Sequence, residues 1–125
     1  MSRLCILHVD DDENIRALTA LAFDLGGDAV VHSAVSGADA LRLLAEGLRP
    51  DLLLLDVMMP DMDGPTLLRE TRGMATSTPA IFMTAQTQDH EIARLLALGA
   101  IGVVIKPFDP LVLGTQVLSM LRGSG

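Results

Sequence analysis

The fold is decided by the stretch Asp51-Leu52-Leu53-Leu54-Leu55-Asp56-Val57-Met58-Met59-Pro60-Asp61-Met62-Asp63-Gly64. Four leucines run directly into Asp56, and a proline, two aspartates and a glycine follow. A short apolar run bounded by turn residues is typical of a strand that is buried on both faces of a parallel sheet. Asp56 would then lie at the carboxyl end of that strand, which is the edge where open α/β sheets bind their ligands. A carboxylate held there without a partner is costly, so Asp56 is a candidate site residue.

Strand-like and helix-like segments alternate on both sides of the leucine run. The predicted strands span residues 4–9, 29–32, 52–56, 79–84 and 102–105, and the predicted helices span residues 13–25, 37–46, 64–72, 88–98 and 110–122. Five strand–helix pairs in succession predict an α/β fold, a doubly wound five-stranded parallel sheet in the order 2-1-3-4-5 with right-handed crossovers. That order places the carboxyl ends of the first and third strands side by side, so Asp10, Asp11 and Asp56 are expected to meet.

Apolar residues at helical spacing identify the helix faces that should pack on this sheet. The expected inward residues are Ile15, Leu18, Ala22 and Leu25 in the first helix, Leu41, Leu44 and Leu48 in the second, Ile92, Leu95 and Leu98 in the fourth, and Leu113, Val117 and Leu121 in the last. The last helix also carries Leu111, Val112, Leu118 and Met120, which exceed one packed face. Exposed apolar patches often mark interfaces, so we expect this helix to serve a homodimer or an effector.

Composition limits the classes of function. The 125 residues suffice for one domain, expected over residues 1–122 with a flexible tail at 123–125. The net charge of -7 and the lack of tryptophan and tyrosine argue against direct nucleic-acid binding through phosphate contacts or base stacking. No apolar run reaches the ~18–20 residues of a membrane span, and no signal-peptide pattern is present. The single cysteine, Cys5, is expected to be a buried inert thiol, so we predict a cytoplasmic location without membrane insertion.

The acidic run Asp10-Asp11-Asp12 follows the first predicted strand. A solvated loop with helix-capping carboxylates is one interpretation, and it suits Asp12. Asp10 and Asp11 are expected beside Asp56, and like charges at a low-dielectric edge repel each other unless a cation joins them. An all-oxygen ligand set favours Mg²⁺, so we predict a magnesium site at this edge.

Lys106, the only lysine of the chain, ends the fifth predicted strand and precedes Pro107. A surface turn is the alternative interpretation, but a lysine at this edge reaches both the carboxylates and a phosphoryl oxygen. A cis bond to Pro107 in a tight turn would aim the lysine inward. Thr84, at the end of the fourth strand, offers a hydroxyl to the same anion. Together these residues predict an acyl-phosphate site in which Asp56 attacks phosphorus while Mg²⁺, Lys106 and Thr84 hold the phosphoryl oxygens.

The chain resembles the response regulator receiver domain, the flavodoxin-like (βα)5 or CheY-like fold of two-component signalling, over essentially its whole length. The matching motifs are Val9-Asp10-Asp11-Asp12, Asp56 to Gly64, Thr84-Ala85 and Lys106-Pro107-Phe108. The resemblance implies a phosphoprotein of a phosphorelay, in which Asp56 accepts a phosphoryl group from a sensor histidine kinase or a phosphotransfer protein.

The resemblance also implies a role for each remaining site residue. Asp11, Asp56 and the Met58 carbonyl would bind Mg²⁺ directly, with Asp10 acting through water. Thr84 would be the switch hydroxyl and Lys106 the cation that contacts the phosphate. Phosphorylation would bias the face made of the fourth helix, the fifth strand and the last helix. Such a domain is not an enzyme, because it catalyses only its own phosphorylation and dephosphorylation.

One position departs from the family pattern. Family members often have an aromatic residue three positions before the lysine, and it turns inward on activation, whereas this chain has Val103. An aromatic relay is therefore not expected here. The positions that tune phosphate lifetime in the family are Met58 and Gln86, and neither side chain is an evident general base. We predict slow self-dephosphorylation.

Other functions fit the same residues less well. A phosphorylation-independent interaction module of the same fold would lack the Asp, Thr or Lys set, which this chain keeps. Asp61-Met62-Asp63-Gly64 resembles the Asp-x-Asp-Gly motif of haloacid-dehalogenase-type phosphatases, but it stands off the strand end. We expect Asp61 and Asp63 to be turn and cap residues instead. His8 and His32 are expected to be core histidines with satisfied hydrogen bonds, and His90 a surface residue.

Overall fold

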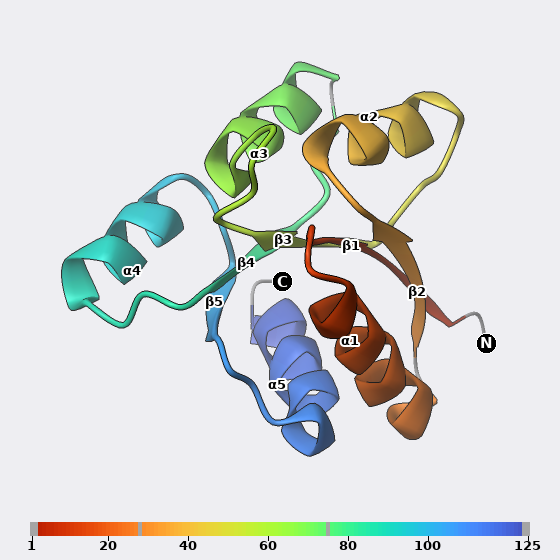
Figure 1. Ribbon diagram of the computed structural model, residues 1–125, viewed down its shortest axis with the longest axis vertical. Helices are drawn as coiled ribbons and strands as arrows, with labels where there is room; N and C mark the ends of the chain where they lie inside the picture. The colour runs from red at the N-terminus through yellow and green to blue at the C-terminus, as the bar shows by residue number, and fades with distance from the viewer. Residues whose placement is uncertain (1–2, 28, 75, 124–125) are drawn as a thin grey trace.

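Strands and helices alternate along the chain in the computed structural model, which describes residues 3–27, 29–74 and 76–123 (Figure 1). The strands are β1 (Leu4–Val9), β2 (Ala29–Ala34), β3 (Leu52–Asp56), β4 (Ala80–Thr84) and β5 (Gly102–Ile105). The helices are α1 (Glu13–Gly26), α2 (Gly37–Ala45), α3 (Gly64–Gly73), α4 (Asp89–Ala97) and α5 (Pro110–Gly123).

The five strands form one parallel sheet in the order β2-β1-β3-β4-β5, which confirms the predicted topology. Helices α1 and α5 cover one face of the sheet, and α2, α3 and α4 cover the other (Figure 1). β1 pairs with both β2 and β3, so the strand order reverses beside β1. The chain therefore leaves the carboxyl ends of β1 and β3 toward different faces, and this switch point is where doubly wound sheets place a site.

The predicted bounds agree with the structure to within one residue, except in β2. This strand continues past His32 to Ala34, because its register with β1 extends to the pair Val9–Ala34. Backbone pairing rather than local propensity sets its end. Gly123 lies in α5, and the rest of the predicted tail, residues 124 and 125, lies outside the described residues. Within the described ranges, no helix has the length and hydropathy needed to cross a membrane.

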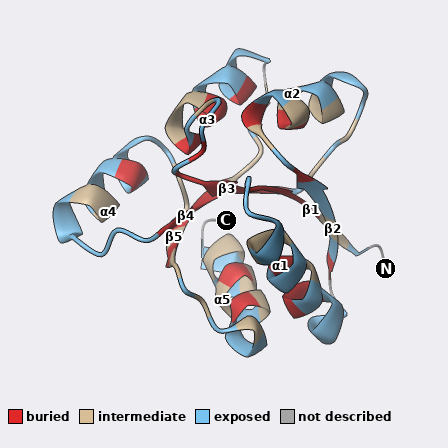
Figure 2. Ribbon diagram, viewed as in Figure 1, coloured by how far each residue is buried: buried red, intermediate tan, exposed pale blue. Residues whose placement is uncertain are grey.

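The leucine strand β3 is buried along its whole length (Figure 2). Leu53 and Leu55 pack in the core beneath α2 and α3, whereas Leu52 and Leu54 pack in the core beneath α1 and α5. Successive side chains of a strand point to opposite faces, so an unbroken apolar run is what a strand covered on both sides requires. β3 therefore fixes Asp56 at the centre of the sheet edge.

The predicted inward face of α1 is wrong in part. Leu18 is 39% exposed and Leu25 is 61% exposed, while the buried residues are Thr19, Ala22 and Phe23. Phe23 and Ala22 pack against Gly114 of α5, whose position would bring an added Cβ 3.9 Å from the Phe23 ring and the Ala22 carbonyl. The face of α1 that meets α5 therefore contains Ala22 and Phe23, whereas Leu18 and Leu25 lie outside it.

The inward faces of α4 and α5 follow the prediction more closely. Leu113 and Val117 of α5 are fully buried, as is Leu95 of α4. Leu98 is 48% exposed, contrary to prediction, because α4 ends at Ala97 and Leu98 is its C-cap. At the start of α5, Leu111 is 79% exposed, which agrees with the expected apolar patch, whereas Met120 packs on the core.

Side-chain carboxylates and hydroxyls begin the helices as predicted. The side chains of Asp12, Ser36 and Asp63 accept backbone N–H bonds at the starts of α1, α2 and α3. The Asp61 carboxylate also accepts from Gly37 N at 3.4 Å and from Ala38 N at 3.2 Å, which ties the loop after β3 to α2. The carboxylates of Asp61 and Asp63 therefore accept hydrogen bonds at the starts of α2 and α3, as turn and cap residues do.

Gly64 allows α3 to begin directly against β3, and we expect Gly64→Ala to destabilise the fold. An added Cβ would lie 2.5 Å from the Asp56 carbonyl oxygen and 3.1 Å from both the Val57 Cα and the Phe82 ring. The free energy of unfolding in urea should fall by about 3 kcal/mol, as for an overpacked core. Gly73→Ala is the matched control at the other end of α3, because its Cβ meets nothing within 4 Å. Equal stabilities of the two variants would contradict the prediction.

Candidate functional site

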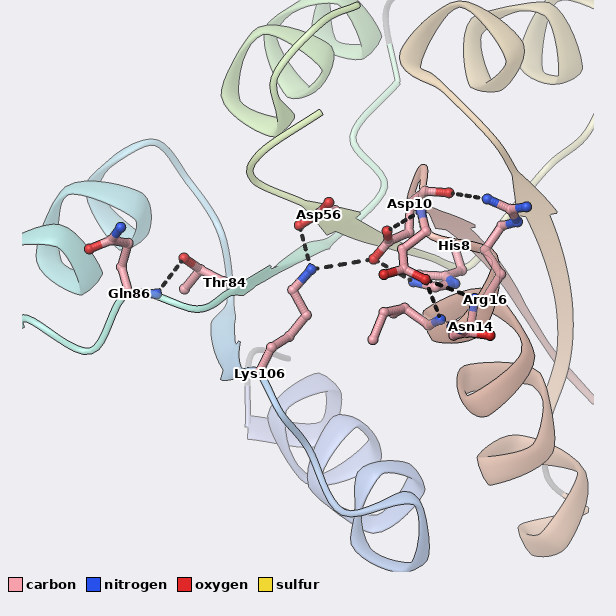
Figure 3. Close-up of polar contacts among 10 residues, drawn as sticks. His8, Asp10, Asn14, Arg16, Asp56, Thr84, Gln86 and Lys106 are labelled. Atoms are coloured by element: carbon pink, nitrogen blue, oxygen red, sulfur yellow. Dashed lines mark hydrogen bonds and ion pairs between the residues drawn. The ribbon is translucent and has the colours of Figure 1, made fainter. Parts of the chain in front are cut away.

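Four neighbouring strand ends bring the predicted residues to one edge of the sheet (Figure 3). Asp10 and Asp11 follow β1, Asp56 ends β3, Thr84 ends β4, and Lys106 follows β5. The strands are parallel, so their carboxyl ends share this edge, and the predicted order places β1 and β3 next to each other. The parallel sheet therefore makes neighbours of residues that are up to 96 positions apart in the chain.

The acidic cluster consists of Asp10, Asp11 and Asp56. Each offers one carboxylate oxygen, and these oxygens lie within 4.8 Å of one another. Asp10 and Asp56 are buried, whereas Asp11 is exposed. Burial strengthens the repulsion between like charges, and a hard cation between the oxygens would relieve it. The cluster therefore fits a divalent cation that takes oxygen ligands and keeps water molecules on its open side, by Asp11.

Lys106 supplies the positive charge that the acidic cluster lacks. Its Nζ lies 2.8 Å from Asp56 Oδ1 and 3.5 Å from Asp10 Oδ2. The Lys106–Pro107 peptide bond is cis, and Lys106 N donates to the Thr84 carbonyl oxygen at 2.8 Å. Burial alone would lower the pKa of Lys106, but the hydrogen bond and attraction from Asp56, reinforced by Asp10, raise it. Lys106 therefore stays charged against the two carboxylates.

Asp10 is held in place from several directions. Its Oδ1 accepts from Asp12 N at 2.9 Å, and its carbonyl oxygen accepts from Arg16 Nη1 at 2.8 Å (Figure 3). Burial raises the pKa of Asp10, and the charge of Asp56 adds to the increase, while the bond from Asp12 and the charge of Lys106 oppose it. A carboxylate that is both fixed and costly to ionise is the kind of group a bound cation stabilises.

Thr84 lies at this edge but is turned to its own loop. Its side chain is almost fully buried, and its Oγ1 accepts from Gln86 N at 3.0 Å (Figure 3). Within the described part of the chain, no hydrogen bond joins the Thr84 hydroxyl to Asp56 or Lys106. The structure thus brings Asp10, Asp11, Asp56 and Lys106 into one contact group, with Thr84 beside it.

Two further predicted positions flank the cluster. Met58 follows β3 by two residues, and its side chain is 74% exposed. The predicted metal contact is through its backbone carbonyl, and that role stays a prediction. Val103 lies in β5, is half-buried, and packs against the core beneath the α2–α4 face. A small branched side chain thus occupies the position of the familial aromatic residue.

His8 belongs to the site, although the sequence predicted an ordinary core histidine. It is fully buried on β1, and its Nε2 lies 3.9 Å from Asp10 Oδ2. Neither ring nitrogen has a hydrogen-bond partner among the described residues, so the prediction of a satisfied histidine is wrong. Burial lowers the pKa of His8 to about 3, and the positive charges of Lys106 and Arg16 add to the shift. The sequence signal that could have placed His8 at the site was its position two residues before Asp10, on the same strand.

The predictions for the other two histidines and for the cysteine are confirmed only in part. His90 is exposed, as predicted, whereas His32 is also exposed, so the prediction of a core histidine at that position is wrong. Cys5 is half-buried rather than fully buried, and its backbone N donates to Asp51 Oδ2 at 2.8 Å. Burial, with the negative charge of Asp51, raises the pKa of the Cys5 thiol. A raised thiol pKa agrees with the expected lack of reactivity.

Comparisons with known proteins agree with this fold. The model of the response regulator receiver domain family matches residues 6–118. Regulatory protein AtoC of Escherichia coli K12 is 44% identical over 104 residues, which are 83% of this chain and 22% of AtoC. Transcriptional regulatory protein CseB of Streptomyces avermitilis is 38% identical over 122 residues, which are 96% of this chain and 50% of CseB. The structure of chemotaxis protein CheY4 of Vibrio cholerae matches with a TM-score of 0.85 and 29% identity, over 95% of this chain and 99% of CheY4.

The chain spans half or less of the length of AtoC and CseB. Within that span, the family match covers all five strands in part or in full and includes Asp10, Asp11, Asp56, Thr84 and Lys106. Sheet order, site position and sequence similarity therefore lead to the same conclusion. The chain belongs to the response regulator receiver domain family, whose members are phosphorylation-dependent switches of two-component signalling.

Proposed function

We propose that Asp56 is the phosphoryl acceptor of this domain and that its donor is a histidine kinase or a phosphotransfer protein. The observation that carries the proposal is the placement of the Asp56 carboxylate, which is buried, 2.8 Å from Lys106 Nζ, and within the acidic cluster. A carboxylate with a purely structural role would need a counter-ion such as Lys106, but not the neighbouring acids as well. A carboxylate between a cation-binding pair of acids and a fixed ammonium is suited to receive a dianionic phosphoryl group.

The transfer needs in-line attack by an Asp56 oxygen on the phosphorus of the donor phosphohistidine. The P–N bond of the donor breaks as the P–O bond to Asp56 forms, and the donor imidazole leaves with the electron pair. Asp11, Asp56 and the Met58 carbonyl are the proposed direct Mg²⁺ ligands, with Asp10 acting through water. The ion would supply charge neutralisation for the phosphoryl oxygens. Lys106 orients the acceptor before transfer and holds a phosphoryl oxygen afterwards, because its Nζ already contacts the acceptor.

Thr84 is proposed as the residue that passes the change outward. Its hydroxyl accepts from Gln86 N in the present state, so binding to a phosphoryl oxygen would redirect it and pull on the loop before α4. Lys106 follows β5 and is bonded through its backbone to Thr84. The two residues would thus bias α4, β5 and α5 together. Because position 103 is a valine, this route contains no aromatic side chain that could change rotamer. Slow self-dephosphorylation stays a prediction, because neither Met58 nor Gln86 offers an evident general base.

The proposed partners follow from the same face. Leu111 and Val112, exposed at the start of α5, are the proposed contacts with a second copy or an effector domain. The domain is proposed to act chemically only on its own Asp56. The alternative, an interaction module that works without phosphorylation, keeps the fold but predicts no change in covalent mass.

Phosphorylation in the test tube separates these functions. We expect the protein to gain the mass of one phosphoryl group when it is incubated with acetyl phosphate and Mg²⁺, with acetate as the leaving group. Chelation of Mg²⁺ by EDTA should abolish the gain, because repulsion between the acidic cluster and the phosphoryl donor is then unrelieved. Intact-protein mass spectrometry measures the outcome. No gain with Mg²⁺ present would favour the phosphorylation-independent module.

Replacing Lys106 should separate metal binding from signalling. Lys106→Ala removes a positive charge 2.8 Å from a proposed metal ligand, so we expect the Mg²⁺ affinity measured by calorimetry to rise about fivefold. Arg122→Ala, an exposed cation at the end of α5, should leave that affinity unchanged. Phosphorylation should still occur, but the amide chemical shifts of α4, β5 and α5 should no longer respond to it. A normal response in Lys106→Ala would contradict the assigned role.

A further inference from the structure

The three arginines Arg69, Arg72 and Arg94 line one groove between α3 and α4, away from the acidic edge. The groove encloses about 470 Å³ and opens to solvent, and its apolar lining comes from Pro65, Leu68 and Leu98. Arg69 and Arg72 stand three residues apart on α3 and therefore share a helix face, while Arg94 lies across the groove on α4. Three of the eight arginines of a chain with net charge -7 thus converge on one surface.

The positive charge of this groove is only partly used within the chain. Arg94 forms an ion pair with Glu91, and Arg72 Nη1 donates to the Thr78 carbonyl oxygen at 2.9 Å. Arg69 takes part in none of the ion pairs found among the described residues. The guanidinium of Arg69 and the free edge of Arg72 are thus open to an external carboxylate. A planar guanidinium binds a carboxylate through two parallel hydrogen bonds.

One acid, Asp63, lines the same groove. Its carboxylate caps α3 by accepting from Thr66 N at 2.8 Å. The hydrogen bonds from Thr66 lower the pKa of Asp63, and the charges of Arg69 and Arg94 contribute to the decrease. Asp63 therefore offsets part of the arginine charge but leaves the lining residues with more positive than negative groups.

The apolar part of the groove decides the kind of ligand. Leu68 is 3% exposed and forms the floor, while Leu98 remains 48% exposed at the end of α4. The floor favours an apolar side chain, and Arg69 and Arg72 of α3 favour carboxylates beside it. Nucleic acid fits less well, because no aromatic residue lines the groove for base stacking and the chain as a whole repels phosphate backbones.

We propose that the α3–α4 groove binds an acidic peptide segment of a partner protein. In the bound state an apolar side chain of the segment covers Leu68 and Leu98, and Asp or Glu side chains on either side of it pair with Arg69 and Arg72. The groove lies outside the acidic cluster, and binding there does not require phosphorylation of Asp56. The interaction surface is therefore additional to the α4–β5–α5 face proposed to respond to phosphorylation.

The test uses the whole chain, labelled with ¹⁵N, and a short synthetic peptide in which glutamates flank leucines at helical spacing. We expect the peptide to shift amide signals of α3 and α4 selectively. Arg69→Gln combined with Arg72→Gln should weaken its binding about tenfold, because two charge-assisted contacts are lost. Arg122→Gln, an exposed arginine outside the groove, should bind as the wild type does. Unchanged thermal unfolding of both variants confirms that the fold is intact.

Two matched peptides and two other anions give the outcomes that would overturn the proposal. The peptide with glutamine in place of glutamate should bind weakly, and equal binding would mean that the arginines play no part. The peptide with serine in place of leucine should also bind weakly, and equal binding would exclude the apolar floor. Inorganic phosphate or a short RNA that shifts the same amides more strongly than the acidic peptide would assign the groove to phosphate instead. Peptide-induced shifts confined to other helices would reject the site altogether.

Discussion

Asp56→Asn is expected to abolish the phosphoryl mass gain from acetyl phosphate completely. The amide nitrogen and oxygen of asparagine keep the shape of the carboxylate, but a neutral amide oxygen is not a nucleophile toward phosphorus at neutral pH. The substitution also replaces one carboxylate of the acidic cluster, a proposed Mg²⁺ ligand, with a neutral amide, so Mg²⁺ affinity should fall. Both losses follow from the change in charge at one buried position.

The variant should nevertheless stay folded, which makes its inactivity interpretable. Asp56 lies beside the buried Asp10, and neutralising one of two adjacent carboxylates removes a repulsion while costing the ion pair with Lys106. Thermal unfolding of Asp56→Asn is therefore expected to be close to that of the wild type.

Asp61→Asn is the matched control for this experiment. Asp61 is an exposed acid of the loop after β3, and its carboxylate serves the start of α2 rather than the acidic cluster. This variant should be phosphorylated as the wild type is. An equal mass gain in Asp56→Asn would reject Asp56 as the acceptor, whereas loss of the gain in both variants would point to a shared effect on the loop.

His8 should make the protein sensitive to acid, because it is buried as a neutral imidazole. Its pKa is lowered from the ordinary value of 6.5 to about 3 in the folded chain. Between these two values the unfolded chain binds a proton that the folded chain does not. The unfolded state therefore gains stability as the pH falls, and the free energy of unfolding decreases from about pH 6.5 toward pH 3.

The slope and its control identify the residue responsible. One such proton changes the free energy of unfolding by at most about 1.4 kcal/mol per pH unit, measured by urea unfolding across the range. Asp10 opposes the trend, because its raised pKa lets the folded chain bind a proton earlier on acidification. The difference between wild type and His8→Leu isolates the histidine, since a leucine never binds a proton. His90→Leu, at an exposed position, should retain the wild-type slope.

If His8→Leu lost stability with pH as steeply as the wild type between pH 6.5 and 3, the acid sensitivity would lie elsewhere. The same variant tests the structural cost of His8 at neutral pH. Both ring nitrogens lack partners among the described residues, so removing them should leave the protein at least as stable as before.

The strands of this protein were predictable because each contains a short apolar run. A run such as Leu52–Leu55 is typical of a strand in a sheet that is covered on both faces. The helix faces were harder to predict. Leucines at helical spacing in α1 suggested Leu18 and Leu25 as inward residues, yet the inner face is set by how closely Phe23 and Gly114 bring α1 and α5 together. The spacing of apolar residues predicts that a segment is helical, but the contact with the neighbouring helix decides which face of it points inward.

The sequence by itself determined the strands, the helices and the residues at the strand ends, because hydrophobic period and turn chemistry act over a few residues. The strand order was then predicted from the order common to five-stranded doubly wound sheets. That was sufficient to assemble Asp10, Asp11, Asp56 and Lys106 at one edge. Only the tertiary structure decided that His8 lies unpaired beneath Asp10, that Thr84 bonds to Gln86, and that three arginines share the α3–α4 groove. These relations depend on side-chain direction and on the packing of elements distant in the chain, and no local pattern encodes either.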